Sequence, residues 1–311
     1  MRLIFVNLKR FEVPREMGGI CPMDDPAEWI EYVIEKSVEL ELGTLDPSEL
    51  RLIYLLPEAL ILPAVRKLRS YPEGERRTIE VGSQSVFRED ISPGGNFGAF
   101  TTNLPPAAAR NLRCTWSIIG HSEERKDKLG LLGSFEPSVA DDPDLGLRAQ
   151  ETVDKIINQE VQGALEAGLD VLLCIGETAD ERGEGDFAEQ KPRIEMVLKR
   201  QVSLGLKDAQ SRLSERRIVI GYEPIWAIGP GKTPPEQEYI SYVSRYIKTA
   251  VEEEFGFEPA VVYGGGLKEE NAGMIAQIET IDGGLVALTR FTGQIGFYPE
   301  ELKKIIEKYQ Q

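Results

Sequence analysis

The chain is built from short apolar runs that alternate with longer stretches in which apolar residues recur every three or four positions. Short apolar runs rich in β-branched residues and bounded by glycine, proline or polar residues are typical of buried strands. Eight such runs occur along the 311 residues. They predict strands at positions 3–7, 51–56, 78–82, 115–119, 170–175, 217–222, 260–264 and 283–287.

A predicted helix follows each predicted strand. Several of these stretches begin with proline or an acidic residue and end near glycine, as helix polarity favours. The helices are expected at 26–42, 59–68, 105–112, 150–167, 187–204, 235–253, 268–277 and 299–308. Strands that are apolar nearly throughout indicate a parallel sheet covered by helices, and eight strand–helix units are the number that closes a barrel. We therefore predict an α/β fold in which residues 1–311 form a single (β/α)8 barrel domain.

The composition narrows the kinds of partner that the chain can have. Hydrophobic residues make up 41% and charged residues 28%, which is ordinary for a globular protein. However, 52 Asp and Glu residues against 36 Lys and Arg residues give a net charge of −16. This charge argues against nucleic acid or an anionic membrane surface as a partner. The apolar run at 3–6 is too short for a signal peptide and no run is long enough to span a membrane, so we expect a cytoplasmic protein.

The cysteines and the histidine argue against a metal site. Cys21, Cys114 and Cys174 form no CxxC pair and are odd in number, so they indicate neither a disulfide framework nor a zinc site. His121 is the one histidine, and carboxylates do not cluster at the spacing of metal ligands. We therefore expect no metal.

Candidate chemistry gathers at the carboxyl ends of the predicted strands, where a barrel of this kind carries its catalytic residues. The groups there are Asn7 and Lys9, then His121, Ser122 and Glu123, then Cys174 and Glu177, then Glu223, and lastly Gly264, Gly265 and Gly266. Each group also has a simpler interpretation: a lone histidine is often a core residue, a lysine often lies at the surface, and glycines often form a tight turn. Their shared position at strand ends favours a functional site.

The stretch 217–233 has the features of a catalytic base beneath a closing loop. Glu223 comes where the predicted strand ends, and Pro224 removes a backbone donor, so the strand cannot continue. An apolar pair at 225–226 and a small-residue tip at 227–231 then follow, as in a lid. The GPGKT at the end of the stretch is not a phosphate-binding P-loop, because that motif needs a glycine where Trp226 stands. The simpler alternative is a strand, a turn and a surface carboxylate.

Seven motifs together carry a resemblance to a known family. They are NxK at 7–9, IEVGSQSV at 79–86, GAFT at 98–101, GHSE at 120–123, CIGE at 174–177, YEPIWAIGPGKT at 222–233 and YGGGLKEENA at 263–272. In this order they resemble the triosephosphate isomerase family, and the resemblance covers essentially the whole chain. It implies a TIM barrel and an aldose–ketose isomerase that needs no cofactor and no metal.

The resemblance also implies a role for each matching residue. Glu223 would be the base that moves a proton between adjacent carbons, His121 the group that polarises the carbonyl, and Lys9 the cation that stabilises the enediolate. Lys9 and its neighbour Asn7 would line the pocket of a phosphorylated small sugar, and Glu123 would support the site. Three glycines would bind the substrate, one at the tip of the lid and two after the seventh strand: Gly229, Gly265 and Gly266.

The sequence departs from the family pattern at the phosphate end of the expected site. The last strand of the family ends in a pair of glycines where this chain has Ala287 and Leu288, and Gly266 replaces a serine. Two interpretations stay open. Arg290 binds the phosphate through its planar guanidinium, or it lies at the surface or pairs with Glu300 or Glu301 while glycines further along the loop, Gly293 and Gly296, rebuild the cup.

The resemblance also implies a homodimer, with Thr101 of GAFT at the contact. A charge pair that is usual in the family is absent, because Glu124 stands where an arginine is usual and Asn103 where an acid is usual. In the lid, Pro230 stands where a threonine is usual, and we expect it to stiffen the tip. Extra residues after Lys9, between 84 and 98, in the acidic segment 131–145 and after the last strand predict insertions in several βα loops.

Three functions fit these observations. The leading hypothesis is the interconversion of dihydroxyacetone phosphate and glyceraldehyde 3-phosphate through an enediolate. The second keeps the chemistry but uses a longer ketose phosphate, such as an erythrulose phosphate, and is supported by the changed loop after the last strand. The third is a barrel that has lost catalysis and serves as a binding protein, against which the retained Asn7, Lys9, His121 and Glu223 argue.

Overall fold

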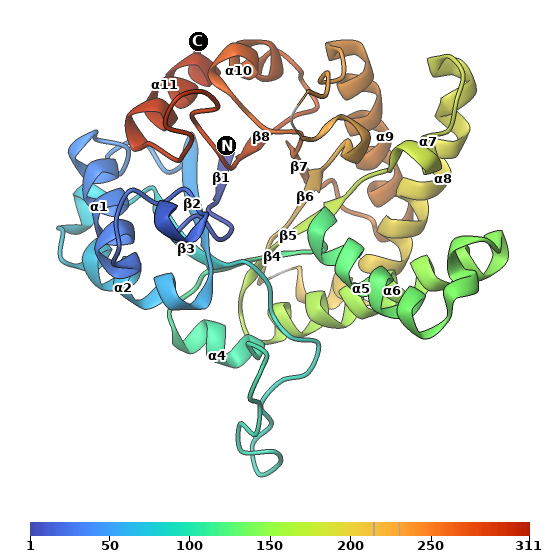
Figure 1. The fold of residues 1–311 in the computed structure, drawn as a ribbon, viewed down its shortest axis with the longest axis horizontal. Helices are drawn as coiled ribbons and strands as arrows, with labels where there is room; N and C mark the ends of the chain where they lie inside the picture. Colours follow the sequence, from blue (N-terminus) through green and yellow to red (C-terminus); the bar gives the residue numbers. More distant parts are fainter. Residues whose placement is uncertain (214, 230) are drawn as a thin grey trace.

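The eight predicted strands are present and close into a parallel barrel (Figure 1). The computed structural model describes residues 1–213, 215–229 and 231–311. Each strand pairs with the next in the chain, and the last pairs with the first. The strands are β1 (Arg2–Asn7), β2 (Leu50–Leu56), β3 (Ile79–Ser83), β4 (Trp116–Ile119), β5 (Asp170–Ile175), β6 (Ile218–Tyr222), β7 (Ala260–Tyr263) and β8 (Gly283–Val286). The expected (β/α)8 TIM barrel is therefore confirmed.

The barrel interior is filled by alternate residues of the strands. Side chains of a strand point to opposite faces in turn, so one set fills the barrel and the other packs against the helices. The interior set contains Phe5 and Trp116, whose rings meet edge to face with centroids 5.1 Å apart. The outer set forms the larger core between strands and helices. This double burial explains why the strands are apolar nearly throughout.

Helices cover the outside of the barrel, and all eight predicted helices are present. Their ends lie within three residues of the prediction, except that α6 begins seven residues earlier than expected. They are α1 (Pro26–Glu39), α2 (Glu58–Arg69), α4 (Pro106–Asn111), α6 (Pro143–Glu166), α8 (Phe187–Gly205), α9 (Gln237–Phe255), α10 (Glu269–Ala276) and α11 (Pro299–Gln310). The side chains of Asp25, Asp142 and Asp186 accept hydrogen bonds from first-turn N–H groups and so fix where α1, α6 and α8 begin. No helix in the described parts of the chain is long and apolar enough to cross a membrane.

One expected insertion has a different structure from the one predicted. Segment 131–145 was expected to be a loop, but it contains the end of a further helix, α5 (Ser122–Phe135), a short 3-10 helix at Pro137–Ala140 and the start of α6. Helix α5 buries none of its residues fully. Leu129 and Leu132 pack against the core, whereas Leu131 and Phe135 are exposed. The sequence therefore lacks the single apolar face by which an amphipathic helix is recognised. Two single-turn helices, α3 (Glu73–Arg76) and α7 (Ala179–Arg182), were also not predicted.

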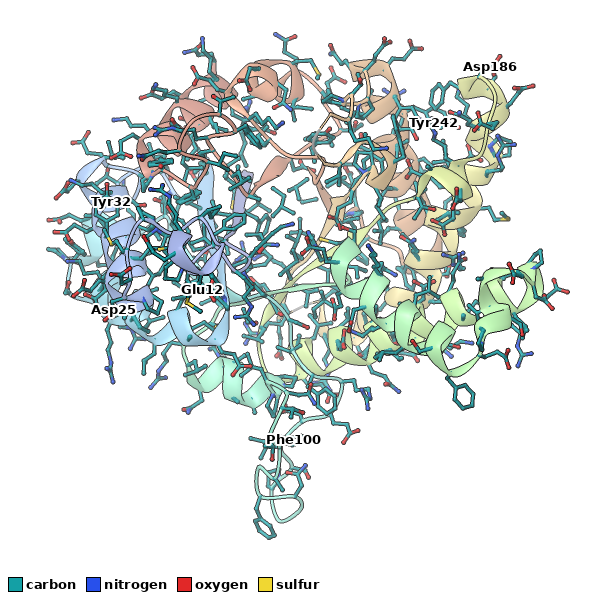
Figure 2. The ribbon with its side chains drawn as sticks, in the orientation of Figure 1. Glu12, Asp25, Tyr32, Phe100, Asp186 and Tyr242 are labelled. Atoms are coloured by element: carbon teal, nitrogen blue, oxygen red, sulfur yellow. The ribbon has the colours of Figure 1, made fainter. Side chains whose placement is uncertain are left out.

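The segment between β3 and α4 extends away from the barrel. In Figure 1 it is the long teal loop below α4, and Figure 2 shows Phe100 of the GAFT motif along it. Near its tip the side chain of Phe97 is 87% exposed. This loop is one of the expected insertions, and it is the described segment that stands furthest from the packed body in this view.

Candidate active site

The barrel brings the predicted site residues to one rim. Asn7 is the last residue of β1, Glu223 directly follows β6, and His121 and Glu177 each lie two residues beyond β4 and β5. Because all strands of the closed sheet are parallel, their carboxyl ends lie at the same end of the barrel. A close backbone approach helps here: a Cβ on Gly176 would lie 1.8 Å from the carbonyl oxygen of Glu223, so only glycine fits.

Glu223 and His121 are in direct contact, although 102 positions separate them in the chain. Nε2 of His121 lies 3.2 Å from Oε1 of Glu223, whose side chain is 2% exposed. Ser122 also holds this carboxylate: its backbone N–H donates to Oε2 at 2.9 Å and its hydroxyl to Oε1 at 3.1 Å. The predicted base and the predicted electrophile therefore share one buried cluster, and Ser122 is a partner to which sequence reasoning gave no role.

Hydrogen bonding defines the tautomer of His121. The residue is the N-cap of α5, and its Nδ1 accepts the backbone N–H of Glu123 at 3.3 Å. A ring nitrogen that accepts an N–H carries no proton, so in the neutral imidazole the proton lies on Nε2. Nε2 is the nitrogen that faces Glu223. The helix start thus presents an N–H donor to the site rather than a basic nitrogen.

Lys9 is held at the rim by three neighbours. Its ammonium forms an ion pair with Glu123, with Nζ and Oε1 2.7 Å apart, and its backbone N–H donates to Oδ1 of Asn7 at 3.1 Å. The amide of Gln84 donates to both Oδ1 of Asn7 and the carbonyl oxygen of Lys9. The backbone of Lys9 has a φ of 45°, a conformation that costs a residue other than glycine roughly 1 kcal/mol or more. The conformation is kept because the Asn7–Gln84 contacts fix the loop.

The Lys9–Glu123 pair affects the protonation of Glu123. Burial by itself raises the pKa of this carboxyl group, but the hydrogen bond and the charge of Lys9 outweigh burial, so the pKa of Glu123 is lowered. Glu123 therefore stays ionised in neutral solution and keeps the ammonium of Lys9 at the edge of the site. This contact agrees with the supporting role expected of Glu123, which stays a prediction.

A second buried carboxylate anchors the base of the lid. Oε1 of Glu177 accepts hydrogen bonds from the hydroxyls of Tyr222 and Tyr239, at 3.0 and 2.7 Å, and from Nε1 of Trp226 at 2.7 Å. Burial raises the pKa of Glu177 even though these donors lower it. Trp226 belongs to a 3-10 turn at Ile225–Ala227, the apolar hinge expected after Glu223. Tyr239 lies on α9, and nothing in the local sequence pattern connects it to Glu177.

The lid tip is open to solvent. Gly229 is exposed and has a φ of 120°, which favours glycine. Pro230, predicted to stiffen this tip, lies outside the described residues. At the base, by contrast, the guanidinium of Arg182 stacks over the ring of Trp226 at 3.8 Å. The loop therefore combines an anchored base at Trp226 with an exposed glycine at Gly229.

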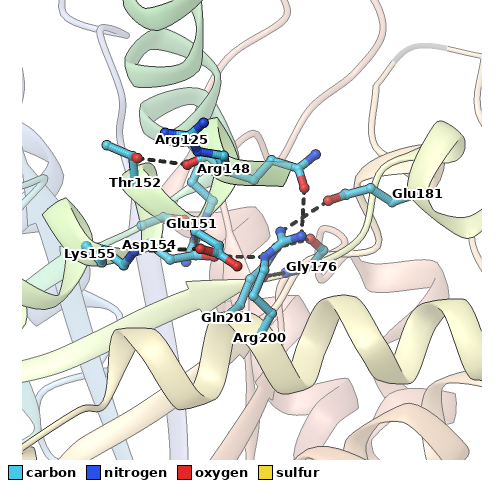
Figure 3. Close-up of polar contacts among 12 residues, drawn as sticks. Arg125, Arg148, Glu151, Thr152, Asp154, Lys155, Gly176, Glu181, Arg200 and Gln201 are labelled. Carbon is cyan, nitrogen blue, oxygen red and sulfur yellow. Dashed lines mark hydrogen bonds and ion pairs between the residues drawn. The ribbon is translucent and has the colours of Figure 1, made fainter. Parts of the chain in front are cut away.

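A polar network supports the rim from below. Arg200 of α8 donates from Nε to Asp154 of α6 at 3.0 Å and from Nη2 to Glu181 of α7 at 3.3 Å (Figure 3). Asp154 also pairs with Arg125 of α5. The side-chain amide of Gln201 bonds both the N–H and the carbonyl oxygen of Gly176. These contacts connect the helices around a cavity of about 510 Å³ beneath the lid.

Comparison with known proteins identifies the family. The family model described as triosephosphate isomerase matches residues 42–294. A protein from Aspergillus oryzae named triosephosphate isomerase is 30% identical over 279 residues, which cover 88% of this chain and 93% of the relative. The chain belongs to the triosephosphate isomerase family. It is thus an isomerase of the intramolecular oxidoreductase class.

Further comparisons agree with this family and with its fold. A relative from Chloroherpeton thalassium, also named triosephosphate isomerase, is 34% identical over 215 residues, which are 68% of this chain and 71% of that relative. The crystal structure of triosephosphate isomerase from Bartonella henselae superposes with a TM-score of 0.66 and covers 100% of this chain and 99% of the other. At 20% identity this structural match supports the barrel fold alone.

The loop between β8 and α11 is where this member of the triosephosphate isomerase family departs most from the expected site. The guanidinium of Arg290 is engaged within the loop region: Nε and Nη2 bond Oε1 of Glu301 at 2.7 and 2.6 Å, and the group stacks over the ring of Tyr298 at 3.7 Å. Backbone hydrogen bonds between Arg290 and Gly296 close the loop. Of the two interpretations of Arg290, the geometry favours the pair with Glu301.

Glycines after β7 keep free backbone donors. Within the described residues, the N–H groups of Gly265 and Gly266 donate to no backbone or side-chain acceptor. The carbonyl oxygen of Gly266 accepts from the amide of Asn271 at 3.0 Å, and this bond turns the peptide. Free N–H groups before a helix suit an anion, in agreement with the substrate-binding role expected of both glycines.

Glu124, which replaces the usual arginine, is part of a buried ion cluster. Nζ of Lys128 lies 2.5 Å from Glu124 and 3.0 Å from Glu160 of α6, and Ser85 donates to Glu124 at 3.2 Å. Burial and the nearby charge of Glu124 raise the pKa of Glu160 to about 9, against the opposing effect of Lys128. The single charge of Lys128 balances only one of the two carboxylates. The other carboxyl group, that of Glu160, therefore keeps its proton in neutral solution. The cluster borders a cavity of about 350 Å³ lined also by Arg10, Gln84 and Asn103.

We expect the proton on Glu160 to make stability depend on pH. Folded protein keeps the Glu160 proton that the unfolded chain releases above its ordinary pKa of 4.5, so stability falls as pH rises from there toward about 9. The side chain of Gln in Glu160→Gln does not titrate. As pH rises through this range, the free energy of unfolding of Glu160→Gln should therefore increase relative to that of wild type, by up to about 1.4 kcal/mol per pH unit. Denaturant unfolding at several pH values measures this difference; a constant difference between the two proteins would contradict it.

A second prediction concerns Arg290. If its guanidinium stays with Glu301, Arg290→Met should leave kcat/KM for the best substrate within about twofold of wild type. Steady-state kinetics provide the measurement, with Lys303→Met on the outer helix α11 as the matched loss of one positive charge. A fall of about tenfold or more in Arg290→Met alone would instead show that the guanidinium leaves Glu301 to bind the phosphate.

Proposed function

We propose that the protein interconverts dihydroxyacetone phosphate and glyceraldehyde 3-phosphate through an enediolate, without a cofactor or a metal. The contact between Glu223 and Nε2 of His121 carries this proposal, because it joins a buried carboxylate and an N–H donor at one rim. Proton removal next to a carbonyl needs a base at the carbon and a donor at the oxygen, both within hydrogen-bonding reach.

The residues divide the reaction between them. Glu223 takes a proton from the carbon beside the carbonyl, and the electrons of that C–H bond form the double bond of the enediolate. The carbonyl electrons move to the oxygen, which accepts the N–H of His121 and faces the ammonium of Lys9. Glu223 then returns the proton to the former carbonyl carbon, and the electrons of the enediolate double bond form that C–H bond. The former carbonyl oxygen takes a proton from Nε2 of His121, and the hydroxyl oxygen on the other carbon gives its proton back to Nε2 as it becomes the new carbonyl oxygen, so atoms and electrons balance.

Glu223 must exchange partners before it can act. Both carboxylate oxygens of Glu223 accept hydrogen bonds from Ser122. Pro224 links Glu223 directly to the hinge at Trp226, so closure of the lid would move the carboxylate and the lid base together. A closed lid also excludes water, which protects the enediolate and strengthens its contacts with Lys9 and His121.

We propose further that two chains form a homodimer. The projecting loop that carries Thr101 and the highly exposed Phe97 supports this idea. So does the 350 Å³ cavity, which is lined by Arg10 and Asn103 from the surrounding loops and by Lys128 of α5. An exposed aromatic residue at a loop tip and a neighbouring hollow are features that fit a contact between subunits.

The assignment of the base leads to a direct test. Glu223→Asp withdraws the carboxylate by one methylene, and a misplacement of this size should lower kcat about a hundredfold. A coupled isomerase assay on triose and tetrose phosphates measures the change and also reports which substrate is preferred. Glu307→Asp on the outer face of α11 is the matched control. Undiminished kcat in Glu223→Asp would refute the role of this residue as base.

The proposed homodimer has its own measurement. Light scattering at micromolar concentration should give twice the chain mass of 34.7 kDa. Thr101→Arg should shift the mass toward one chain and lower the activity, whereas Phe135→Ser, at an exposed position on α5, should change neither. A wild-type monomer with full isomerase activity would exclude the dimer.

A further inference from the structure

The phosphate end of the proposed active site lacks several of the donors that the family pattern leads one to expect. Ala287 and Leu288 replace the glycine pair, and Gly266 has no hydroxyl group. Arg290, the cation in the lengthened loop, is engaged by Glu301 and Tyr298. A dianion bound to a chain of net charge −16 needs local positive charge to overcome the repulsion. A phosphate at Gly265 and Gly266 therefore requires positive charge from a cation other than Arg290.

Lys268 lies at this position. Its Cε is 3.9 Å from the point where a Cβ on Gly266 would lie, so the side chain runs beside the glycine whose N–H group is free. Its ammonium lies 4.1 Å from the centroid of the Phe291 ring, in the loop after β8. Within the described residues no carboxylate comes within 4.0 Å of this ammonium, in contrast to Lys9 and Arg290.

The backbone around Lys268 is fixed on both sides. The N–H of Leu267 donates to the carbonyl oxygen of Leu285 in β8 at 3.0 Å, and Leu267 itself is fully buried. The N–H of Lys268 donates to Oδ1 of Asn271 at 2.8 Å, and Asn271 also holds the carbonyl oxygen of Gly266. These hydrogen bonds hold the Cα of Lys268 in a fixed position next to the free N–H groups of Gly265 and Gly266.

We propose that Lys268 binds the phosphate of the substrate together with the N–H groups of Gly265 and Gly266, and that Phe291 holds its ammonium in place. This inference rests on the proposed function and assigns the anionic end of that same site. A cation over an aromatic ring is held without a counter-ion and sheds part of its water. Lys268 thus keeps its charge available for a phosphate, whereas an ion pair would neutralise it.

The pairing of Lys268 with Phe291 gives the changed loop after β8 a function. The loop no longer offers a glycine pair, but it supplies the ring that positions a cation from the loop after β7. A lysine is a point charge with rotatable donors, so it suits a phosphate approached from one side. The simpler alternative is a solvated lysine that happens to cover an exposed ring. The two interpretations predict different kinetics.

Steady-state kinetics of Lys268→Met test the proposal. The phosphate is remote from the reacting carbons, so loss of the Lys268 ammonium should mainly weaken substrate binding. We expect KM for glyceraldehyde 3-phosphate to rise about tenfold or more, with a smaller change in kcat. The inhibition constant of inorganic phosphate should rise by a similar factor. Lys268→Arg should restore much of the affinity, and Phe291→Leu should weaken it less than Lys268→Met does. Lys303→Met on α11 is the control for loss of one positive charge.

The outcomes separate this inference from the proposed function. If wild type is active and Lys268→Met matches it within about twofold in KM and in phosphate inhibition, the role of Lys268 is overturned while the isomerase proposal stands. If wild type has no isomerase activity, calorimetric titration with inorganic phosphate still decides: weaker binding to Lys268→Met than to Lys303→Met supports the site, and equal binding excludes it. Circular dichroism of each variant checks that the barrel is folded.

Discussion

Closure of the sheet between β8 and β1 is the constraint on which the site depends. A Cβ on Gly283 would lie 1.8 Å from the carbonyl oxygen of Leu3, so the last strand can pair with the first only because this position carries no side chain. Once closed, a parallel barrel gathers every strand's carboxyl end at one rim. Asn7, His121 and Glu223 meet there although they come from distant parts of the chain.

The buried carboxylates at this rim accept hydrogen bonds that offset the cost of removing them from water. Glu177 has three donors on one oxygen, and Glu223 has two bonds from Ser122. Buried charges without such partners would cost several kcal/mol, roughly 3–5 when one partner is removed. These contacts hold the platform in place beneath the hinge of the lid at Ile225–Ala227. A fixed platform beneath a movable lid is what positioning of a small substrate requires.

At the site, the departures from the family motifs lie at the phosphate end and not at the proposed base and donor. Proton transfer needs the base and the donor within a fraction of an ångström of their productive positions, so Glu223 and His121 leave little freedom. An anion can be bound by backbone N–H groups, by a guanidinium or by an ammonium. The phosphate end can therefore exchange a glycine pair for other donors. Likewise Glu124, which replaces the usual arginine, is paired with Lys128 within the same chain, and Lys128 also contacts Glu160.

The sequence by itself determined the barrel and the candidate residues at its rim. Strand and helix order follow from periodicity, because a strand buried on both faces has to be apolar throughout; Glu223 and His121 were identified by position at strand ends and by motif. Helix α5 was missed, because it covers the core with only part of an irregular apolar surface. The partners of side chains were decided by tertiary structure alone: that Arg290 pairs with Glu301, that Tyr239 reaches Glu177, and that Lys268 lies over Phe291. Such pairs join separate elements, and their distances depend on how the whole chain packs.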